Sequence, residues 1–166
     1  MTLVCDILRP DHAAPWLTLR EEGARDFPLA FLFSEARARA TSEKQARRIL
    51  EKGSMHGVFD GEDLIGFCGL SRKRWKLTRH RATIGPVFVT RDRQGGGAAA
   101  LLLDHVIRAA RDNGVAQLEL FVDTNNTRAI RFFESFGFER VALHPDRVRD
   151  GDTSRDSYFY RLRSPH

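Results

Sequence analysis

Hydrophobic and polar residues are grouped along the chain with the spacings of helices and strands. The clearest helical pattern runs from Ala99 to Ala110, where apolar side chains recur every three or four residues and polar ones fill the opposite face. Asn113-Gly114 then ends the helix. Two short apolar runs flank Asp60-Gly61, which predicts a β-hairpin. The predicted strands are 3–8, 57–59, 64–70, 83–89, 118–122, 138–143 and 157–162, and the predicted helices are 11–26, 42–52, 99–112 and 129–136.

The composition is that of one ordinary folded domain. The 166 residues are 42% hydrophobic, and no apolar run reaches the roughly 20 residues that cross a bilayer. We therefore expect a single domain over residues 1–166, in the cytoplasm and without a membrane partner. Cys5 and Cys68 lie in apolar runs without metal or redox spacing, so we interpret them as buried thiols in a reducing compartment. The six histidines are scattered, and we expect no metal.

A glycine run before the clearest helix predicts an anion-binding loop. Gly95, Gly96 and Gly97 follow an apolar strand and a polar turn over 90–94. A helix start presents unpaired N–H groups, and glycines let an anionic ligand approach the backbone, so a phosphate is the expected guest. Gly95, Gly97 and Ala100 also satisfy the dinucleotide fingerprint, with Asp123 as the ribose acid. The five-residue turn and the short chain that follows speak against this alternative.

The segment Gln94–Ala99 also fits the pattern Q/R-x-x-G-x-G/A without a gap. This is the pyrophosphate-binding signature of the GNAT acyl-CoA N-acetyltransferases, and the chain resembles this superfamily. A second signature follows: a strand over 118–122, an N-x-x-A helix beginning with Asn126, and the closing Gly137-Phe138. Together the two motifs cover Thr83 to Phe138, about a third of the chain.

The resemblance implies a mixed α/β fold. It implies a central, mostly antiparallel sheet of six to seven strands flanked by about four helices, with the strands over 83–89 and 118–122 parallel and splayed apart. The Gly85-Pro86 pair predicts a bulge where the splay would begin, because proline cannot donate a ladder hydrogen bond. An edge or irregular strand is the alternative explanation of the pair, and we place it second because the glycine loop follows at once.

The resemblance also implies acetyl-CoA as cosubstrate and a primary amine as acceptor, which attacks the thioester directly. The acceptor is expected to be a small molecule or a protein, and the enzyme a monomer or homodimer. An alternative is a catalytically weak module that binds or senses acyl-CoA; an RNA-binding domain ranks third. The expected cofactor contacts are the opened strand Val87, Phe88 and Val89, the loop Gln94, Gly95, Gly96, Gly97, Ala98 and Ala99, and Asn126, Ala129 and Phe133.

The groups that would move protons depart from the family pattern. Many members carry a glutamate where this chain has Thr83 and a tyrosine where it has Phe133. The substitutes that we consider are Glu119, His80 and Tyr160. Each also has a plain structural reading: a solvated strand glutamate, an exposed histidine and a core tyrosine.

The basic stretch from Arg72 to Arg81 carries six lysines and arginines around Trp75, in a chain of net charge +5. We interpret it first as a solvated hairpin loop. Recruitment of an anionic acceptor or contact with the CoA 3′-phosphate ranks second. Nucleic-acid binding ranks third and is not expected.

Overall fold

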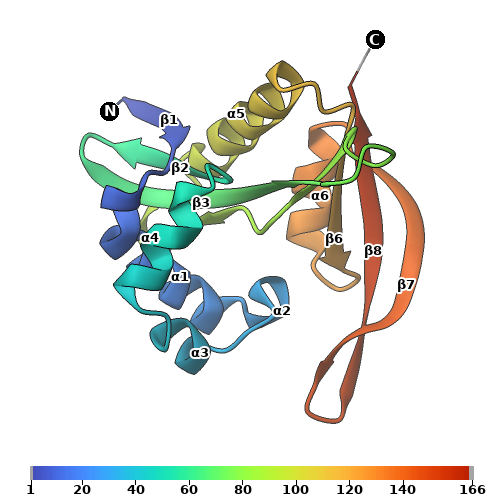
Figure 1. Cartoon of the computed structure of the whole chain (residues 1–166). Helices are drawn as coiled ribbons and strands as arrows, with labels where there is room; N and C mark the ends of the chain where they lie inside the picture. Colours follow the sequence, from blue (N-terminus) through green and yellow to red (C-terminus); the bar gives the residue numbers. More distant parts are fainter. Residues whose placement is uncertain (1, 165–166) are drawn as a thin grey trace. The chain divides into compact units, whose positions relative to one another are not determined.

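The computed structural model describes residues 2–164, which form two compact units (Figure 1). The first unit contains the chain up to Ser71 together with Ile84–Ala109, and the second contains Arg72–Thr83 and the chain from Ala110 onward. Among the described residues, no helix is both long and apolar enough to cross a membrane.

The first unit is built on an antiparallel sheet in the order β1-β2-β3-β5. Helix α5 lies on one side of this sheet, and α1 to α4 lie on the other (Figure 1). The predicted hairpin is present, and Gly61 adopts the positive φ of 61° that its tight turn requires. The strands are β1 (Leu3–Ile7), β2 (Met55–Asp60), β3 (Asp63–Arg72) and β5 (Phe88–Val89).

The helices of this unit largely match the predicted ones. Ser42 caps α4 as a reciprocal pair with Gln45, since its Oγ accepts the N–H of Gln45 at 3.1 Å. Two short helices, α2 and α3, were not predicted, because four or five residues are too few to show a helical period. The bounds are α1 (Ala13–Asp26, after a 3₁₀ turn over Pro10–His12), α2 (Pro28–Phe31), α3 (Glu35–Arg39), α4 (Glu43–Glu51) and α5 (Ala98–Asp112).

Aromatic rings join the helices of the first unit to its sheet. Phe31 of α2 packs edge-on against Phe67 of β3 and Phe88 of β5, with ring centroids 5.9 and 5.7 Å apart. Trp16 of α1 also meets Phe67 edge-on. All four side chains are buried. This core fixes β5, the strand that leads into the glycine loop.

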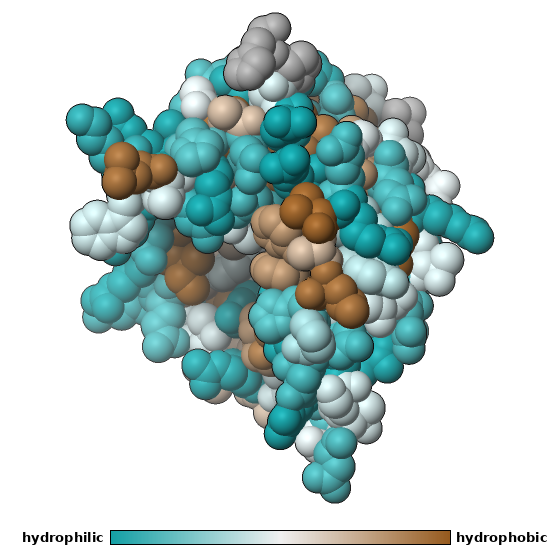
Figure 2. Space-filling view, turned by 90° about the vertical axis from the view of Figure 1, so that its right-hand side faces the viewer, coloured by the Kyte–Doolittle hydropathy of each residue, from teal (hydrophilic) through white to brown (hydrophobic). Residues whose placement is uncertain are grey.

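The second unit contains the parallel pair and a long hairpin. Strand β4 (Arg81–Ile84) runs parallel to β6 (Gln117–Asp123), and β6 pairs antiparallel with β8 (Thr153–Arg163), which pairs with β7 (Glu139–Asp150). Helix α6 (Thr127–Ser135) connects β6 to β7. Figure 2 views the side on which Figure 1 draws β7, and apolar side chains are grouped there among hydrophilic ones. The exposed large hydrophobic side chains of β7 are Val141 and Leu143.

The mixed α/β fold is confirmed, including the parallel pairing of the two strands expected to be parallel. The strand predicted over 83–89 is divided, however, because β4 ends at Ile84 and β5 begins at Phe88. Between them Gly85 donates its N–H to the carbonyl of Gly69 at 2.8 Å. Eight strands are present among the described residues, one or two more than expected, partly because of this division.

Candidate active site

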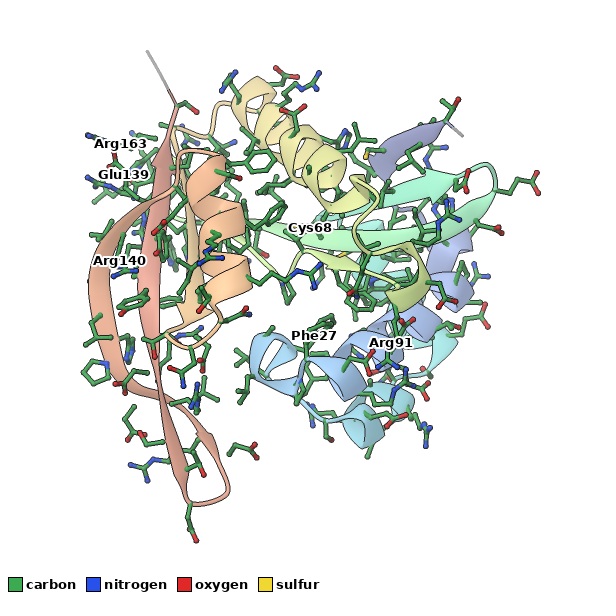
Figure 3. The ribbon with its side chains drawn as sticks, turned by 180° about the vertical axis from the view of Figure 1, so that it is seen from behind. Phe27, Cys68, Arg91, Glu139, Arg140 and Arg163 are labelled. Atoms are coloured by element: carbon green, nitrogen blue, oxygen red, sulfur yellow. The ribbon has the colours of Figure 1, made fainter. Side chains whose placement is uncertain are left out.

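A cluster of hydrogen bonds holds the turn between β5 and α5. The Glu22 carboxylate of α1 accepts the Thr90 hydroxyl at 2.8 and 3.0 Å and the Arg91 N–H at 2.9 Å. Two further ion pairs hold the same turn: Arg91, labelled in Figure 3, pairs with Asp26 at 3.1 Å, and Arg93 pairs with Asp60. Sequence reasoning missed these three carboxylates. The one available signal was the spacing of Glu22 and Asp26, which places them four residues apart on one helix face.

The glycine loop leaves this turn with its backbone open to solvent. Gly95 and Gly97 have φ values of 81° and 86°, and a Cβ atom at either position would meet nothing within 4 Å. In the described chain, the N–H groups of Gly95 and Gly97 form no backbone hydrogen bond. The Gly97 carbonyl begins α5 by accepting the Leu101 N–H at 3.1 Å. These donors at a helix start fit a diphosphate group.

The open edge of β5 continues the loop. Thr90 donates its N–H to Ile65 of β3 at 2.8 Å, so the N–H of Val89, one residue earlier, points to the other side of the strand. Phe88, in contrast, turns its backbone groups toward β3. The Gln94 side chain folds back and donates to the Val89 carbonyl at 2.9 Å. Gln94 therefore ties the strand to the loop.

In the second unit, the N-terminus of α6 carries the other expected cofactor contacts. The Asn126 side chain caps the helix by accepting the Ala129 N–H at 3.1 Å. This capping leaves the amide –NH₂ group of Asn126 for another partner. Phe133 is buried among Phe132 and Phe138, with ring centroids 5.4 and 5.6 Å apart.

Glu119 is a buried carboxylate in an ion pair. It accepts Nε and Nη2 of Arg81 at 2.6 and 2.8 Å and the Gln117 amide at 2.9 Å. Burial raises the pKa of Glu119, but the hydrogen bonds from Arg81 and Gln117 outweigh burial and hold it below its ordinary value. A carboxylate held in this way is a weak proton acceptor.

Tyr160 lies on the opposite face of the same sheet. It pairs directly with Leu120, whereas Glu119 pairs with Arg161, and neighbouring residues of a strand point to opposite faces. The Tyr160 hydroxyl donates to Glu134 of α6 at 2.9 Å and accepts Nε of Arg140, which is labelled in Figure 3, at 3.2 Å. Its pKa is raised, mainly by burial. The sheet therefore separates Tyr160 from Glu119, and the two cannot act together on one reacting group.

The third candidate, His80, is exposed at the end of the basic stretch. Its carbonyl accepts the N–H groups of Ala116 and Gln117 at 2.8 and 3.0 Å. Thr83, at the usual glutamate position, pairs with Glu119 across the parallel ladder. Directly paired residues share a face of the sheet, so the Thr83 side chain lies on the Glu119 face.

Two histidines form a second polar cluster, in the first unit. His56 of β2 is buried, and its Nδ1 lies 3.1 Å from Nε2 of His105 on α5. Burial, followed by the neighbouring His105, lowers the pKa of His56 to about 4. Burial also lowers the pKa of His105. In residues 2–164, no set of three or more metal-binding side chains is placed to hold an ion.

Known proteins share both the sequence pattern and the fold. Mycothiol acetyltransferase of Brachybacterium faecium is 31% identical over 102 residues, covering 56% of this chain and 31% of that protein. The ribosomal protein bS18-alanine N-acetyltransferase of Escherichia coli is 32% identical over 81 residues, covering 49% of this chain and 55% of that protein. This chain thus matches about a third to about half of the length of these relatives.

A solved structure matches over nearly the whole chain. It is the PaiA N-acetyltransferase from Thermoplasma acidophilum in complex with coenzyme A. The match has 15% sequence identity and a TM-score of 0.74, and it covers 99% of this chain and 100% of that chain. At this identity the likeness shows the fold. The family model described as "Acetyltransferase (GNAT) family" matches residues 13–138, which is most of the chain. The chain belongs to the GNAT acetyltransferase family.

Proposed function

We propose that this protein is an N-acetyltransferase that transfers the acetyl group of acetyl-CoA to a primary amine. The observation that carries the proposal is the loop over Gly95–Gly97. The N–H groups of Gly95 and Gly97 form no backbone hydrogen bond in the described chain, and the loop opens directly onto α5. Such a loop suits the diphosphate of CoA. The Val89 N–H, pointing away from β3, would extend the binding edge to the pantetheine amides.

The reaction that fits this site is direct attack. A neutral amine adds to the thioester carbonyl, the C–S bond breaks, CoA leaves as thiolate, and the amine loses one proton while the thiolate gains one. Backbone donors on the β5 edge would polarise the carbonyl, and binding both substrates supplies alignment. No redox step or metal is needed for the atoms and charges to balance.

We propose that solvent takes a larger share of the proton transfers in this protein than in family members that carry both the glutamate and the tyrosine. Glu119 is already paired with Arg81, so it is poorly suited to take the proton of the amine. Phe133 cannot donate a proton to the thiolate. His80 and Tyr160 remain candidates, with exposure favouring His80 and the hydrogen bond to Glu134 weighing against Tyr160.

The acceptor class follows from the relatives by analogy alone. One relative is named for mycothiol and another for the alanine of a ribosomal protein, so both a small molecule and a protein terminus are reasonable acceptors. A second candidate function, a weakly catalytic acyl-CoA-binding module, is motivated by Phe133 at the usual acid position and by the pairing of Glu119.

The test has two stages. Calorimetric titration with acetyl-CoA, CoA and NAD first asks whether the loop binds the expected ligand. Thiol release and mass detection then follow incubation of acetyl-CoA with amines and with N-terminal peptides. Tight acetyl-CoA binding with turnover supports the enzyme, and binding without turnover on any acceptor favours the binding module. NAD binding in place of acetyl-CoA would reject both.

A further inference from the structure

The most exposed large apolar side chains of the described chain lie in its most basic stretch. Trp75 is 79% exposed and Leu77 is 87% exposed. Isolated apolar side chains on a surface need no explanation, but two of them at the tip of one turn do. In the part of the chain that the structure describes, the side chains of Arg74 and Lys76, beside this pair, form no ion pair.

This turn is held in place by its own hydrogen bonds. The Trp75 carbonyl accepts the N–H groups of Thr78 and Arg79 at 2.9 and 2.8 Å. Arg72 closes the base, donating Nε to the Arg79 carbonyl at 2.6 Å and Nη1 to the Asn113 carbonyl at 2.7 Å. The tip is therefore presented in one conformation, and binding through it would cost little ordering entropy.

The positive charge continues at the base of the turn. Lys73 and Arg79 belong to the turn itself, and Arg111 and Arg163 are exposed beside it. Backbone hydrogen bonds join the segments that carry these residues. The His80 carbonyl accepts the Ala116 N–H, and the Ala116 carbonyl accepts the N–H of Ser164, which follows Arg163. Figure 1 draws this turn beside the end of β8. The cations of the turn thus flank its apolar tip, and further exposed cations lie on the neighbouring segments.

We propose that the segment 73–79 docks the protein onto an anionic lipid surface, with Trp75 and Leu77 entering the headgroup layer and the cations lying on the phosphates. Tryptophan prefers this layer, and each nearby cation adds electrostatic attraction. A nucleic acid would use the cations and stack on Trp75, but it offers no apolar medium for Leu77. The aliphatic side chain therefore favours lipid, although the sequence pattern alone predicts a solvated loop and no membrane partner.

Intrinsic fluorescence tests the proposal at the site itself. The chain has two tryptophans, and Trp16 is 2% exposed, so changes in emission report on Trp75. Vesicles of equimolar phosphatidylcholine and phosphatidylglycerol should shift the emission to the blue and protect Trp75 from acrylamide. Pure phosphatidylcholine vesicles should do neither, and raising the salt concentration from about 0.05 to 0.5 M should reverse the effect.

Matched variants test the cations and the apolar side chains of this surface separately. Arg74→Ser with Lys76→Ser should weaken vesicle binding roughly 25-fold, at about fivefold for each charge. Lys44→Ser with Lys52→Ser removes two exposed cations of the α4 region and should change binding little. Leu77→Ser keeps the Trp75 reporter and should reduce the blue shift.

Two outcomes would overturn the proposal. One is the absence of any shift with phosphatidylglycerol vesicles at low salt, or an equal shift with phosphatidylcholine alone. The other is quenching of Trp75 by polyuridylic acid without vesicle binding, which would assign the segment to nucleic acid.

Val141→Ser with Leu143→Ser, which removes exposed apolar side chains on β7, should leave vesicle binding unchanged. All these measurements are independent of acetyl transfer.

Discussion

The Glu119 carboxylate and the Arg81 guanidinium form a two-point ion pair, with N–O distances of 2.6 and 2.8 Å. Glu119 is 4% exposed, whereas the Arg81 side chain is 34% exposed. The pair is therefore unequal: removing the arginine leaves a buried charge, and removing the carboxylate leaves a cation that can reach water.

We predict that Arg81→Gln is the more destabilising change. It should lower the free energy of unfolding by about 2 kcal/mol, less than a fully buried pair would lose, because Arg81 is partly in water. Glu119→Gln should cost less, and the double variant should cost less than the sum of the two. Urea unfolding at pH 7 measures all three. Additive losses would contradict a direct pairing.

The same pair predicts sensitivity to acid. The folded pKa of Glu119 lies below its ordinary value of 4.5, so the unfolded chain takes up the proton first as the pH falls. The contribution of the pair is thus present above pH 4.5 and is lost as the pH falls through the folded pKa. Glu119→Gln should show a flatter decline of the urea midpoint below pH 4.5 than the unmodified protein.

A second acid-sensitive contact joins β2 to α5. His56 has a folded pKa of about 4 against an ordinary value of 6.5, so the unfolded chain binds the proton over this whole window. Stability should be complete above pH 6.5 and should fall toward pH 4. His56→Gln keeps a polar side chain without titration, and its stability should change less over the same range. Parallel curves for the two proteins would show that His56 does not titrate on unfolding.

The cofactor loop gives the sharpest binding prediction. Gly97→Glu places a negative side chain in a backbone conformation with φ of 86° and should abolish acetyl-CoA binding in calorimetry. Gly53→Glu is the matched control, since Gly53 has φ of 66° and open space around it at the end of α4. It imposes similar strain and the same charge but should bind acetyl-CoA normally. Retained binding in a folded Gly97→Glu variant would remove the loop from the cofactor site.

Substitutions of Phe133 test whether a proton donor at this position would help acetyl transfer. Phe133→Tyr should keep or raise turnover once an acceptor is known, because a phenol at this family position can protonate the thiolate. Phe133→Ala should chiefly loosen the packing against Phe132 and Phe138 and weaken acetyl-CoA binding. Steady-state kinetics with calorimetry separates the two effects. A Phe133→Tyr variant that binds acetyl-CoA but has no activity would speak against this position for α6.

Local patterns predicted the parts of the fold that local rules govern. The helical period of α5 and the Asp60-Gly61 turn each depend on a few neighbouring residues, and both are present. The length of the β7–β8 hairpin was underestimated, because its distal part is held by polar pairing. In that part Asp146 accepts Nε of Arg149 at 3.0 Å and the Ser154 hydroxyl at 2.8 Å. Polar strands of this kind show no alternation of apolar residues.

The candidate site also has a part that local sequence patterns predict and a part that they do not. The glycine loop is a contiguous motif and could be recognised directly. The partner of Glu119 lies 38 residues away in the sequence, and the face on which Tyr160 lies depends on the register between β6 and β8. A shift of one residue in that register would have placed Tyr160 on the Glu119 face, so no reading of single strands could decide the matter.

The anchoring of the loop by α1 has a consequence for protein engineering. Exchanging the N-terminal helices is an obvious way to give a transferase of this family a new acceptor. In this chain, however, Glu22 and Asp26 of α1 bind Thr90 and Arg91, directly before the glycine loop. A chimera that replaces α1 must therefore carry both carboxylates with it, because otherwise a change meant for the acceptor would also displace the loop that we propose binds CoA.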